Sequence, residues 1–108
     1  MRRIIVVVVV VLAFAVTALA QSKHELARAH YKAGAAYYQR GKYVDAIREF
    51  EQSYELSRKP EILYNLAQCH DKLGQRDKVA GYLRRYLKEK PKAEDREQVE
   101  AWLGNLEK

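Results

Sequence analysis

The residues of this chain that could do chemistry are a single cysteine and three histidines. Cys69 and His70 are adjacent, and a cysteine and a histidine whose side chains meet would serve as nucleophile and base in a thiol hydrolase. Neighbours along a helix point to different sides of it. Because this segment is predicted to be helical, the pair cannot act together. His24 lies in the first turn of the polar sequence, where we expect it to be solvated.

Other signals of catalysis or metal binding are missing from the sequence. A zinc site needs three or four ligands at a set spacing, and no such spacing exists among the cysteine, histidine and acidic residues. There is no glycine-rich phosphate loop and no pair of carboxylates that stands out from the acidic surface. We therefore predict no enzyme, no metal, no cofactor and no small-molecule substrate. Cys69 cannot form an intramolecular disulfide, and we expect it to be a small buried residue on a helix.

The first twenty residues have the three parts of a secretory signal. Residues 1–3 form a basic start, residues 4–16 run for 13 positions without a polar side chain, and residues 18–20 are Ala-Leu-Ala. The Ala-Leu-Ala sequence puts a small residue at each of the two positions that a signal peptidase recognises. We therefore predict that residues 1–20 are a signal peptide and that the protein is exported to the periplasm or cell envelope.

An uncleaved membrane anchor is the alternative interpretation of the same segment. Residues 4–20 would form about 25 Å of helix at about 1.5 Å per residue. A bilayer core is about 30 Å thick and takes about 20 residues, so the segment is slightly short for a span and well sized for a signal. Cleavage is the favoured interpretation, anchoring in the inner membrane stays open, and export follows from both.

The charge of the polar region is mildly basic and mixed in sign. Cleavage after Ala20 removes Arg2 and Arg3 from the 20 basic residues, which leaves 18 against 14 acidic residues and a net charge of +4. Nucleic-acid-binding proteins gather lysine and arginine on one face, whereas alternating signs are typical of a solvated helix surface. We therefore predict no nucleic-acid partner.

Apolar residues recur three and four positions apart in five segments, which indicates amphipathic helices. Ser22 and Glu25 have the spacing of a capping box and predict a helix start, and Gly41 predicts a left-handed stop. Pro60 fits the first turn of another helix, which Gly74 ends. No segment shows the alternation of a strand, so the predicted fold class is all-α.

The helices form a repeat with a fixed period. Gly41 and Gly74 are 33 residues apart, and each stands seven residues after a small residue, Gly34 and Ala67 respectively. The same offset aligns two further pairs, which are Ala46 with Val79 and Phe50 with Leu83. Self-similarity at this period indicates two copies of one helical hairpin in a solenoid.

The run from His30 to Phe50 resembles the tetratricopeptide repeat. It has the family's small residue at the helix crossing, the tyrosine one turn later, the turn glycine, the aromatic after the turn, the close-contact alanine and the packing aromatic: Gly34, Tyr37, Gly41, Tyr43, Ala46 and Phe50. The second copy keeps this spacing and departs from the family pattern at His70, Arg76 and Val79. The chain is also similar to small exported bacterial repeat proteins. By this resemblance, His30 and His70 should pack where the family has large aromatics.

The resemblance implies a fold and its boundaries. Within residues 22–91, two hairpins of about residues 27–59 and 60–92 would stack into a right-handed superhelical solenoid. Residues 93–107 would form a capping helix. In that helix Glu100 stands where each hairpin has a small residue, as expected if no further helix crosses it.

The resemblance also implies a binding surface, because the first helix of each hairpin lines a concave groove in this family. The residues at these positions are Arg28, Tyr31, Lys32, Ala35, Tyr38 and Gln39 in the first hairpin and Tyr64, Asn65, Gln68, Asp71 and Lys72 in the second. Tyrosines with several cations suit a protein or peptide with an acidic stretch or a free carboxylate. The alternative is that Tyr38 and Tyr64 merely cover neighbouring helices.

One subtype of the family clamps the terminal carboxylate of a peptide with a lysine and two asparagines. Only Asn65 matches that set, because Tyr31 and Ala35 stand at the other two places. We therefore predict no such clamp.

The hypothesis that these observations favour is an exported module that binds a protein or peptide in a groove. Two hairpins and a cap are near the minimum size of a repeat array, so a self-associating structural protein, and hence a homo-oligomer, is one alternative. A membrane-tethered adaptor that keeps the N-terminal segment is the other.

Overall fold

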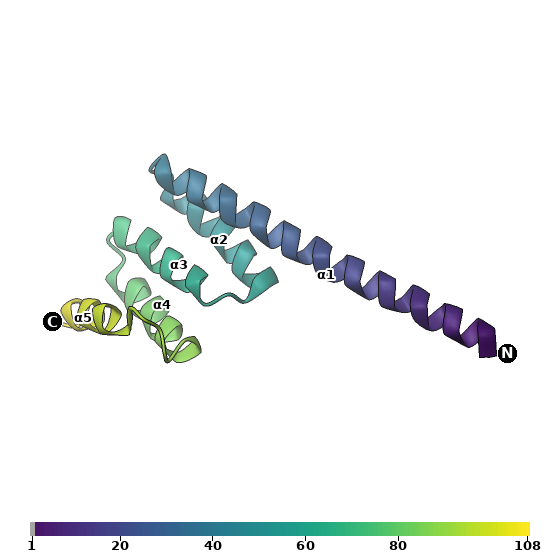
Figure 1. Ribbon diagram of the computed structural model, residues 1–108. Helices are drawn as coiled ribbons and strands as arrows, with labels where there is room; N and C mark the ends of the chain where they lie inside the picture. The colour runs from purple at the N-terminus through teal and green to yellow at the C-terminus, as the bar shows by residue number, and fades with distance from the viewer. Residues whose placement is uncertain (1) are drawn as a thin grey trace.

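The computed structural model describes residues 2–108, and over this range the chain is all-α (Figure 1). Met1, the first residue of the predicted signal segment, lies outside the described residues. From residue 2 to residue 108 the helices follow one another without a strand between them: α1 Arg2–Gln39, α2 Tyr43–Ser57, α3 Glu61–Lys72, α4 Arg76–Glu89 and α5 Arg96–Leu106. The predicted fold class is confirmed.

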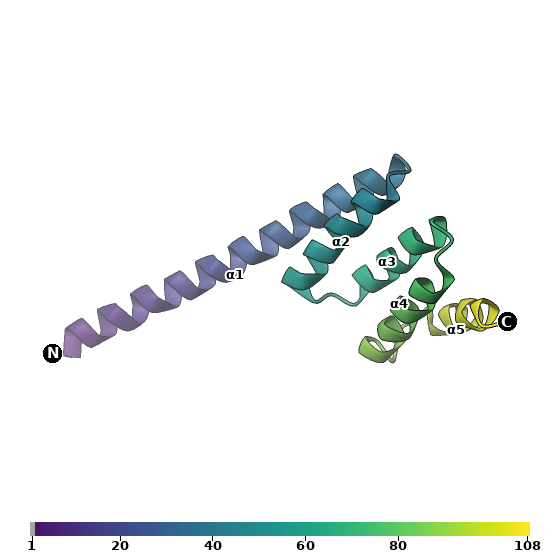
Figure 2. The same ribbon diagram turned by 180° about the vertical axis from the view of Figure 1, so that it is seen from behind.

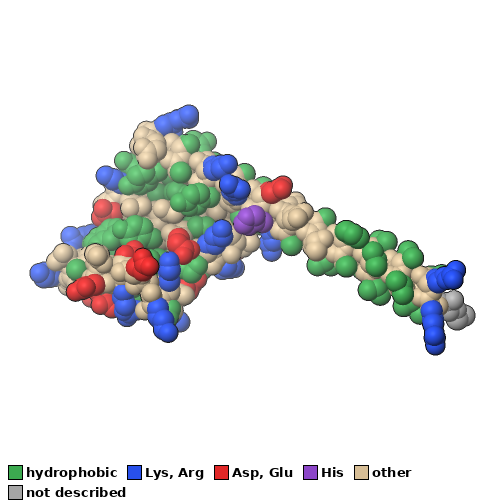
Figure 3. All heavy atoms as spheres, viewed as in Figure 1, with side chains coloured by type: hydrophobic (Ala, Val, Ile, Leu, Met, Phe, Trp, Pro, Cys, Tyr) green, Lys and Arg blue, Asp and Glu red, His purple; other side chains and the backbone are tan. Residues whose placement is uncertain are grey.

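The longest helix, α1, consists of two different halves. Its first half is apolar and exposed, and it projects away from the other helices, with basic side chains near its tip (Figures 1 and 3). Its second half packs on α2, with Ala27 and Gly34 buried. By length and composition α1 could cross a membrane, a property that signal sequences near an N-terminus share.

The predicted helix start at Ser22 is wrong. Helix α1 runs unbroken through Ser22 and Glu25, and both residues are exposed. The apolar segment before them is itself helical, so the backbone N–H groups near Ser22 already have acceptors one turn earlier and need no cap. Thr17, the one polar residue within positions 4–20, also bonds inside the helix: its hydroxyl donates to the carbonyl oxygen of Phe14 at 2.9 Å.

The two predicted turn glycines do end their helices. Gly41 has φ of 73° and Gly74 has φ of 70°, in the left-handed region that favours glycine. The residue after each glycine donates its N–H to a carbonyl five residues back, at 2.9 Å from Lys42 to Tyr37 and 3.0 Å from Gln75 to His70. This is the Schellman pattern, and its recurrence shows that both hairpins turn in the same way.

The small residue at the first helix crossing has a direct steric cause. A Cβ on Gly34 would lie 2.8 Å from Cδ1 of Phe50, closer than real side chains approach. Glycine at this point of α1 therefore allows α2 to pack against it. In the second hairpin the aligned residue, Ala67, is completely buried.

Each helix packs mainly on the helices before and after it in sequence, which is the arrangement of a helical repeat solenoid (Figure 2). The core lies between α2, α3, α4 and α5, and its largest fully buried side chains are Leu63, Leu66, Leu83, Val79 and Val99. Tyr54 of α2 joins the two hairpins, because its hydroxyl donates to the carboxylate of Glu89 on α4 at 2.6 Å.

The last helix, α5, begins three residues later than predicted, at Arg96. Ala93 lies in the turn before it and is buried. Val99 points into the core, whereas Glu100 is exposed and pairs with Arg96 at 2.8 Å. The exposed carboxylate stands where the hairpins have Gly34 and Ala67, so no sixth helix crosses α5 within the described residues.

Candidate partner-binding face

The nine predicted groove residues lie on α1 and α3, the first helices of the two hairpins. We call this set the groove face: Arg28, Tyr31, Lys32, Tyr38, Gln39, Tyr64, Asn65, Gln68 and Lys72. On each helix the spacing of three and four residues places the side chains on one side. The two helices meet across this face, because the amide Nδ2 of Asn65 donates to the hydroxyl of Tyr31 at 3.4 Å.

Two of the three tyrosines of the groove face are partly used for packing. Tyr38 is half-buried with its ring edge on Tyr43, at 5.3 Å between ring centroids. Tyr64 is half-buried between Tyr86 at 5.7 Å and Trp102 at 5.9 Å. These contacts agree with the alternative interpretation, in which Tyr38 and Tyr64 cover neighbouring helices.

Tyr31 is the most accessible tyrosine of the groove face. It is 41% exposed, although one edge of its ring packs on Phe50 at 5.6 Å between centroids. A ring held on one side and open on the other offers contact area at a low cost in conformational entropy. Of the three tyrosines, Tyr31 has the environment that suits a partner contact best.

The cations of the groove face are exposed and lack direct ion pairs with the described residues. Arg28, Lys32 and Lys72 form no ion pair with any residue between 2 and 108. Some cations elsewhere on the domain have partners, for example Lys90 with Glu61 at 2.8 Å, whereas others, such as Arg48 and Lys78, form no ion pair with a described residue. The groove face therefore presents three exposed cations that no described acidic side chain contacts directly.

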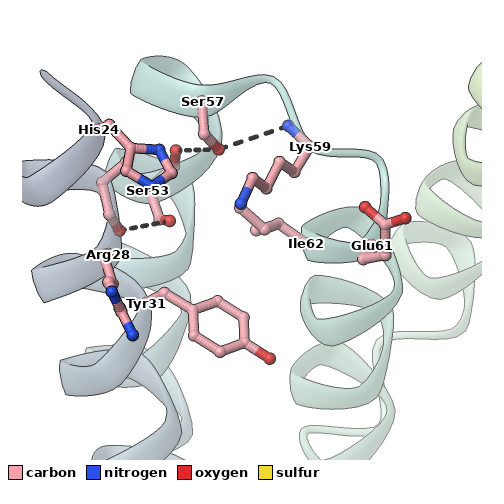
Figure 4. A pocket seen from close by; sticks show the side chains of 9 residues that line it. His24, Arg28, Tyr31, Ser53, Ser57, Lys59, Glu61 and Ile62 are labelled. Atoms are coloured by element: carbon pink, nitrogen blue, oxygen red, sulfur yellow. Dashed lines mark hydrogen bonds between the residues drawn. The ribbon is translucent and has the colours of Figure 1, made fainter. Parts of the chain in front are cut away.

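A cleft of about 670 Å³ opens where α1, the end of α2 and the start of α3 meet (Figure 4). Arg28 and Tyr31 of the groove face line it, together with residues that sequence reasoning missed: His24, Ala27, Ser53, Ser57, Lys59, Glu61 and Ile62. In Figure 4, Tyr31 reaches from α1 into the space between α1 and α3, and Lys59 extends over it from the α2–α3 loop.

Two hydrogen bonds fix the wall of the cleft that α2 supplies. Ser53 is buried, and its hydroxyl donates to the carbonyl oxygen of Ala27 on α1 at 2.8 Å. Ser57 donates to the carbonyl oxygen of Ser53 at 2.9 Å. The first bond joins α2 to α1, and the sequence gives no sign of the cleft beside it.

The surroundings of Cys69, His30 and His70 indicate structural roles for these side chains. Cys69 is completely buried, and burial raises the pKa of its thiol to about 11. His70 is buried as expected, stacks on Tyr82 at 5.3 Å and lies with Nδ1 2.6 Å from the side-chain oxygen of Gln75. His30 is less enclosed than expected and pairs with Glu49 at 2.7 Å.

Residues 2–108 contain no group of three cysteine, histidine or acidic side chains close enough together to hold a metal ion. The described side chains also include no buried polar atom without a hydrogen-bond partner. What the described chain offers is a charged, partly aromatic surface on two helices.

The chain is a helical repeat protein. Its two hairpins turn in the same way, and their first helices leave one face open, as in repeat proteins that bind other proteins. The sequence model described as "Tetratricopeptide repeat" matches residues 37–103, which is more than half of the chain, and the chain belongs to that family. Proteins of this family generally bind protein partners and are typically not enzymes. No curated protein matches the sequence.

Proposed function

We propose that this protein is an exported interaction module that binds a protein or peptide on its groove face. The observation that carries the proposal is the set of three exposed cations, Arg28, Lys32 and Lys72, that have no ion pair among residues 2–108. Arg28 and Lys32 lie on α1 within one turn of the half-open ring of Tyr31, and Lys72 lies at the end of α3. Such a surface suits an acidic segment, because the cations speed encounter and the ring supplies a contact that excludes water.

Export is supported by the N-terminal sequence. The basic start, the apolar helix and the Ala-Leu-Ala motif at residues 18–20 are the parts of a secretory signal. The same helix can also serve as an anchor, and both outcomes place the repeats outside the cytoplasm. The envelope is therefore the compartment in which a partner should be sought.

Charge reversal on the groove face tests the proposal. The variant Lys32→Glu/Lys72→Glu should recover at least about tenfold less partner from envelope extract than the wild type, because an acidic partner then meets like charge. The matched control is Arg48→Glu/Lys78→Glu, which makes the same charge change at two exposed cations of α2 and α4. Recovery is measured by quantitative mass spectrometry.

The comparison of the two variants decides the outcome. Loss in the groove variant alone supports the groove face. Equal recovery by wild type and both variants contradicts it, and equal loss in both variants means that net charge, not this face, attracts the captured protein. Unchanged melting temperatures for the two variants are required, and both substitute exposed side chains that form no ion pair with residues 2–108.

A further inference from the structure

The charge-free part of α1 is longer than its apolar run alone. No charged residue lies between Arg3 and Lys23, which leaves 19 residues, 4–22, in one unbroken helix. At about 1.5 Å per residue this stretch is about 28 Å long, close to the thickness of about 30 Å of a bilayer core. The hydroxyl of Thr17 is bonded to the backbone, as lipid surroundings require, and the other two polar side chains of the stretch, Gln21 and Ser22, lie at its end.

The repeat domain follows this stretch without a linker. Ser53 of α2 bonds to Ala27 of α1, so these two residues are level with each other. Helix α2 runs antiparallel to α1. Four residues after Ser53, α2 therefore reaches Ser57 at the level of Lys23, which lies four residues before Ala27 on α1. The α2–α3 loop therefore lies at the level where the charge-free stretch ends. Figure 1 shows that loop at the end of the domain from which the N-terminal helix projects.

The headgroup layer of a bilayer reaches the cleft if residues 4–22 span the core. That layer is about 5–7 Å thick on each side, which corresponds to about four residues of helix. On α1 it would cover the turn from Lys23 to Ala27. The cleft has His24, Ala27, Ser57 and Lys59 among its lining residues, so its mouth would lie among lipid headgroups.

The charges of the cleft favour an anion. Arg28 and Lys59 form no ion pair with any described residue, whereas the one acidic residue of the lining, Glu61, is bound by Lys90 at 2.8 Å. The cleft has a volume of about 670 Å³, within the range of sites for small organic groups. The exposed apolar half of α1 lies N-terminal to the cleft, beyond the polar residues 21–24.

We propose that α1 is retained in the membrane and that the cleft binds the phosphate headgroup of an anionic phospholipid. Arg28 of α1 and Lys59 of the α2–α3 loop hold the phosphate, and the acyl chains of the lipid run along the apolar half of α1. This inference goes beyond the proposed function, because it concerns the membrane-facing end of the domain. Lys32, Gln68 and Lys72 stay open for a protein partner.

The test is native mass spectrometry of the full chain with two lipids, phosphatidylglycerol and phosphatidylcholine. The wild type should retain one phosphatidylglycerol and prefer it over phosphatidylcholine. Because each cation near an anionic lipid contributes about fivefold, Arg28→Gln/Lys59→Gln should weaken binding of phosphatidylglycerol about 25-fold. The matched control, Arg40→Gln/Lys42→Gln at the other end of the first hairpin, should bind as the wild type does.

Three results would overturn the proposal. An intact mass that begins at Gln21 shows that the helix is not retained. Equal affinity for the two lipids shows that the cleft does not select an anion, and equal loss in both double variants shows attraction by net charge alone. Inorganic phosphate at millimolar concentration should not displace the lipid, because it lacks the acyl chains. The Lys32→Glu/Lys72→Glu variant should keep its lipid, so failure of the groove face and failure of this site are distinguishable.

Discussion

In the two hairpins, different pairs of side chains fill the space where the first helix crosses the second. In the first hairpin Gly34 leaves room for the ring of Phe50, and its missing Cβ would lie 2.8 Å from that ring. In the second hairpin the aligned residues are Ala67 and Leu83, both completely buried. A larger residue on one helix is thus matched by a smaller one on the other. The repeat conserves the volume at the crossing within this chain, and each pair of side chains is one way to fill it.

The hairpins differ more in how much of the first helix they bury. Helix α1 contributes only two buried residues, Ala27 and Gly34. Helix α3, which has neighbours on both sides, contributes six, which are Ile62, Leu63, Leu66, Ala67, Cys69 and His70. The second hairpin therefore carries most of the hydrophobic stabilisation, whereas α1 at the edge leaves its surface available for contacts outside the domain.

The largest effect is expected from truncation in the second hairpin. Leu83→Ala removes a completely buried side chain and should lower the free energy of unfolding by about 2–5 kcal/mol. The change in the urea midpoint measures it. The control is Val44→Ala on α2, whose side chain is 58% exposed and whose loss should cost little. Similar effects of the two substitutions would mean that the burial of Leu83 contributes little to the stability of the second hairpin.

A double-mutant cycle at the first crossing tests the volume exchange. Gly34→Ala should lower the free energy of unfolding by about 1–3 kcal/mol, because its Cβ meets the ring of Phe50. Phe50→Leu alone leaves a small cavity and should also destabilise the domain. The combined variant recreates the alanine–leucine pair of the second hairpin, and it should be at least about 1 kcal/mol more stable than the sum of the two effects implies. Additive effects would disprove the steric account.

Sequence reasoning succeeded where the requirement is local. Gly41 and Gly74 were identifiable as turns because a left-handed backbone favours glycine wherever it occurs. Gly34 was identifiable because its spacing from Gly41 recurs at Ala67. The helix start at Ser22 was wrong for the same local reason: the capping pattern describes a chain that enters a helix there, and this chain is already helical.

The sequence could not predict those features of the candidate site that depend on contacts between helices. Tyr38 and Tyr64 occupy groove positions, but Tyr43 and Trp102 hold their rings partly inside. The cleft depends on how far the end of α2 advances along α1, which the bond from Ser53 to Ala27 reveals. Spacing along one helix contains no information about such distances.

A smaller effect is expected where the hairpins are joined. Tyr54→Phe removes the hydroxyl that donates to Glu89 on α4, and it should lower the free energy of unfolding by about 1 kcal/mol, since the carboxylate can turn to solvent. The control is Tyr37→Phe, because the Tyr37 hydroxyl has no side-chain hydrogen bond among the described residues. Thermal melts of both variants provide the measurement. Equal melting temperatures would show that this bond does not couple the hairpins.

The smallest effect concerns the ion pairs of the two hairpins. The first hairpin is paired through His30 and Glu49, and a histidine is charged only when protonated. The second is paired through Lys90 and Glu61, at 2.8 Å. The hydrogen bond from Lys90 lowers the pKa of Glu61 below 4.5. A lowered pKa in the folded state stabilises the fold above the unfolded pKa, and this contribution is lost as the pH falls through the folded pKa.

Replacement of Lys90 isolates that contribution. In Lys90→Gln the pKa of Glu61 should rise toward 4.5, as followed by NMR titration of its side-chain carboxyl carbon. Above pH 5 the stability should change little, because both side chains are exposed and water screens the pair. Arg58→Gln is the control, since Arg58 pairs with Glu55 and not with Glu61. If the pKa of Glu61 stays the same in Lys90→Gln, the pair that joins α3 to the α4–α5 loop does not persist in solution, and the second hairpin owes its advantage to burial alone.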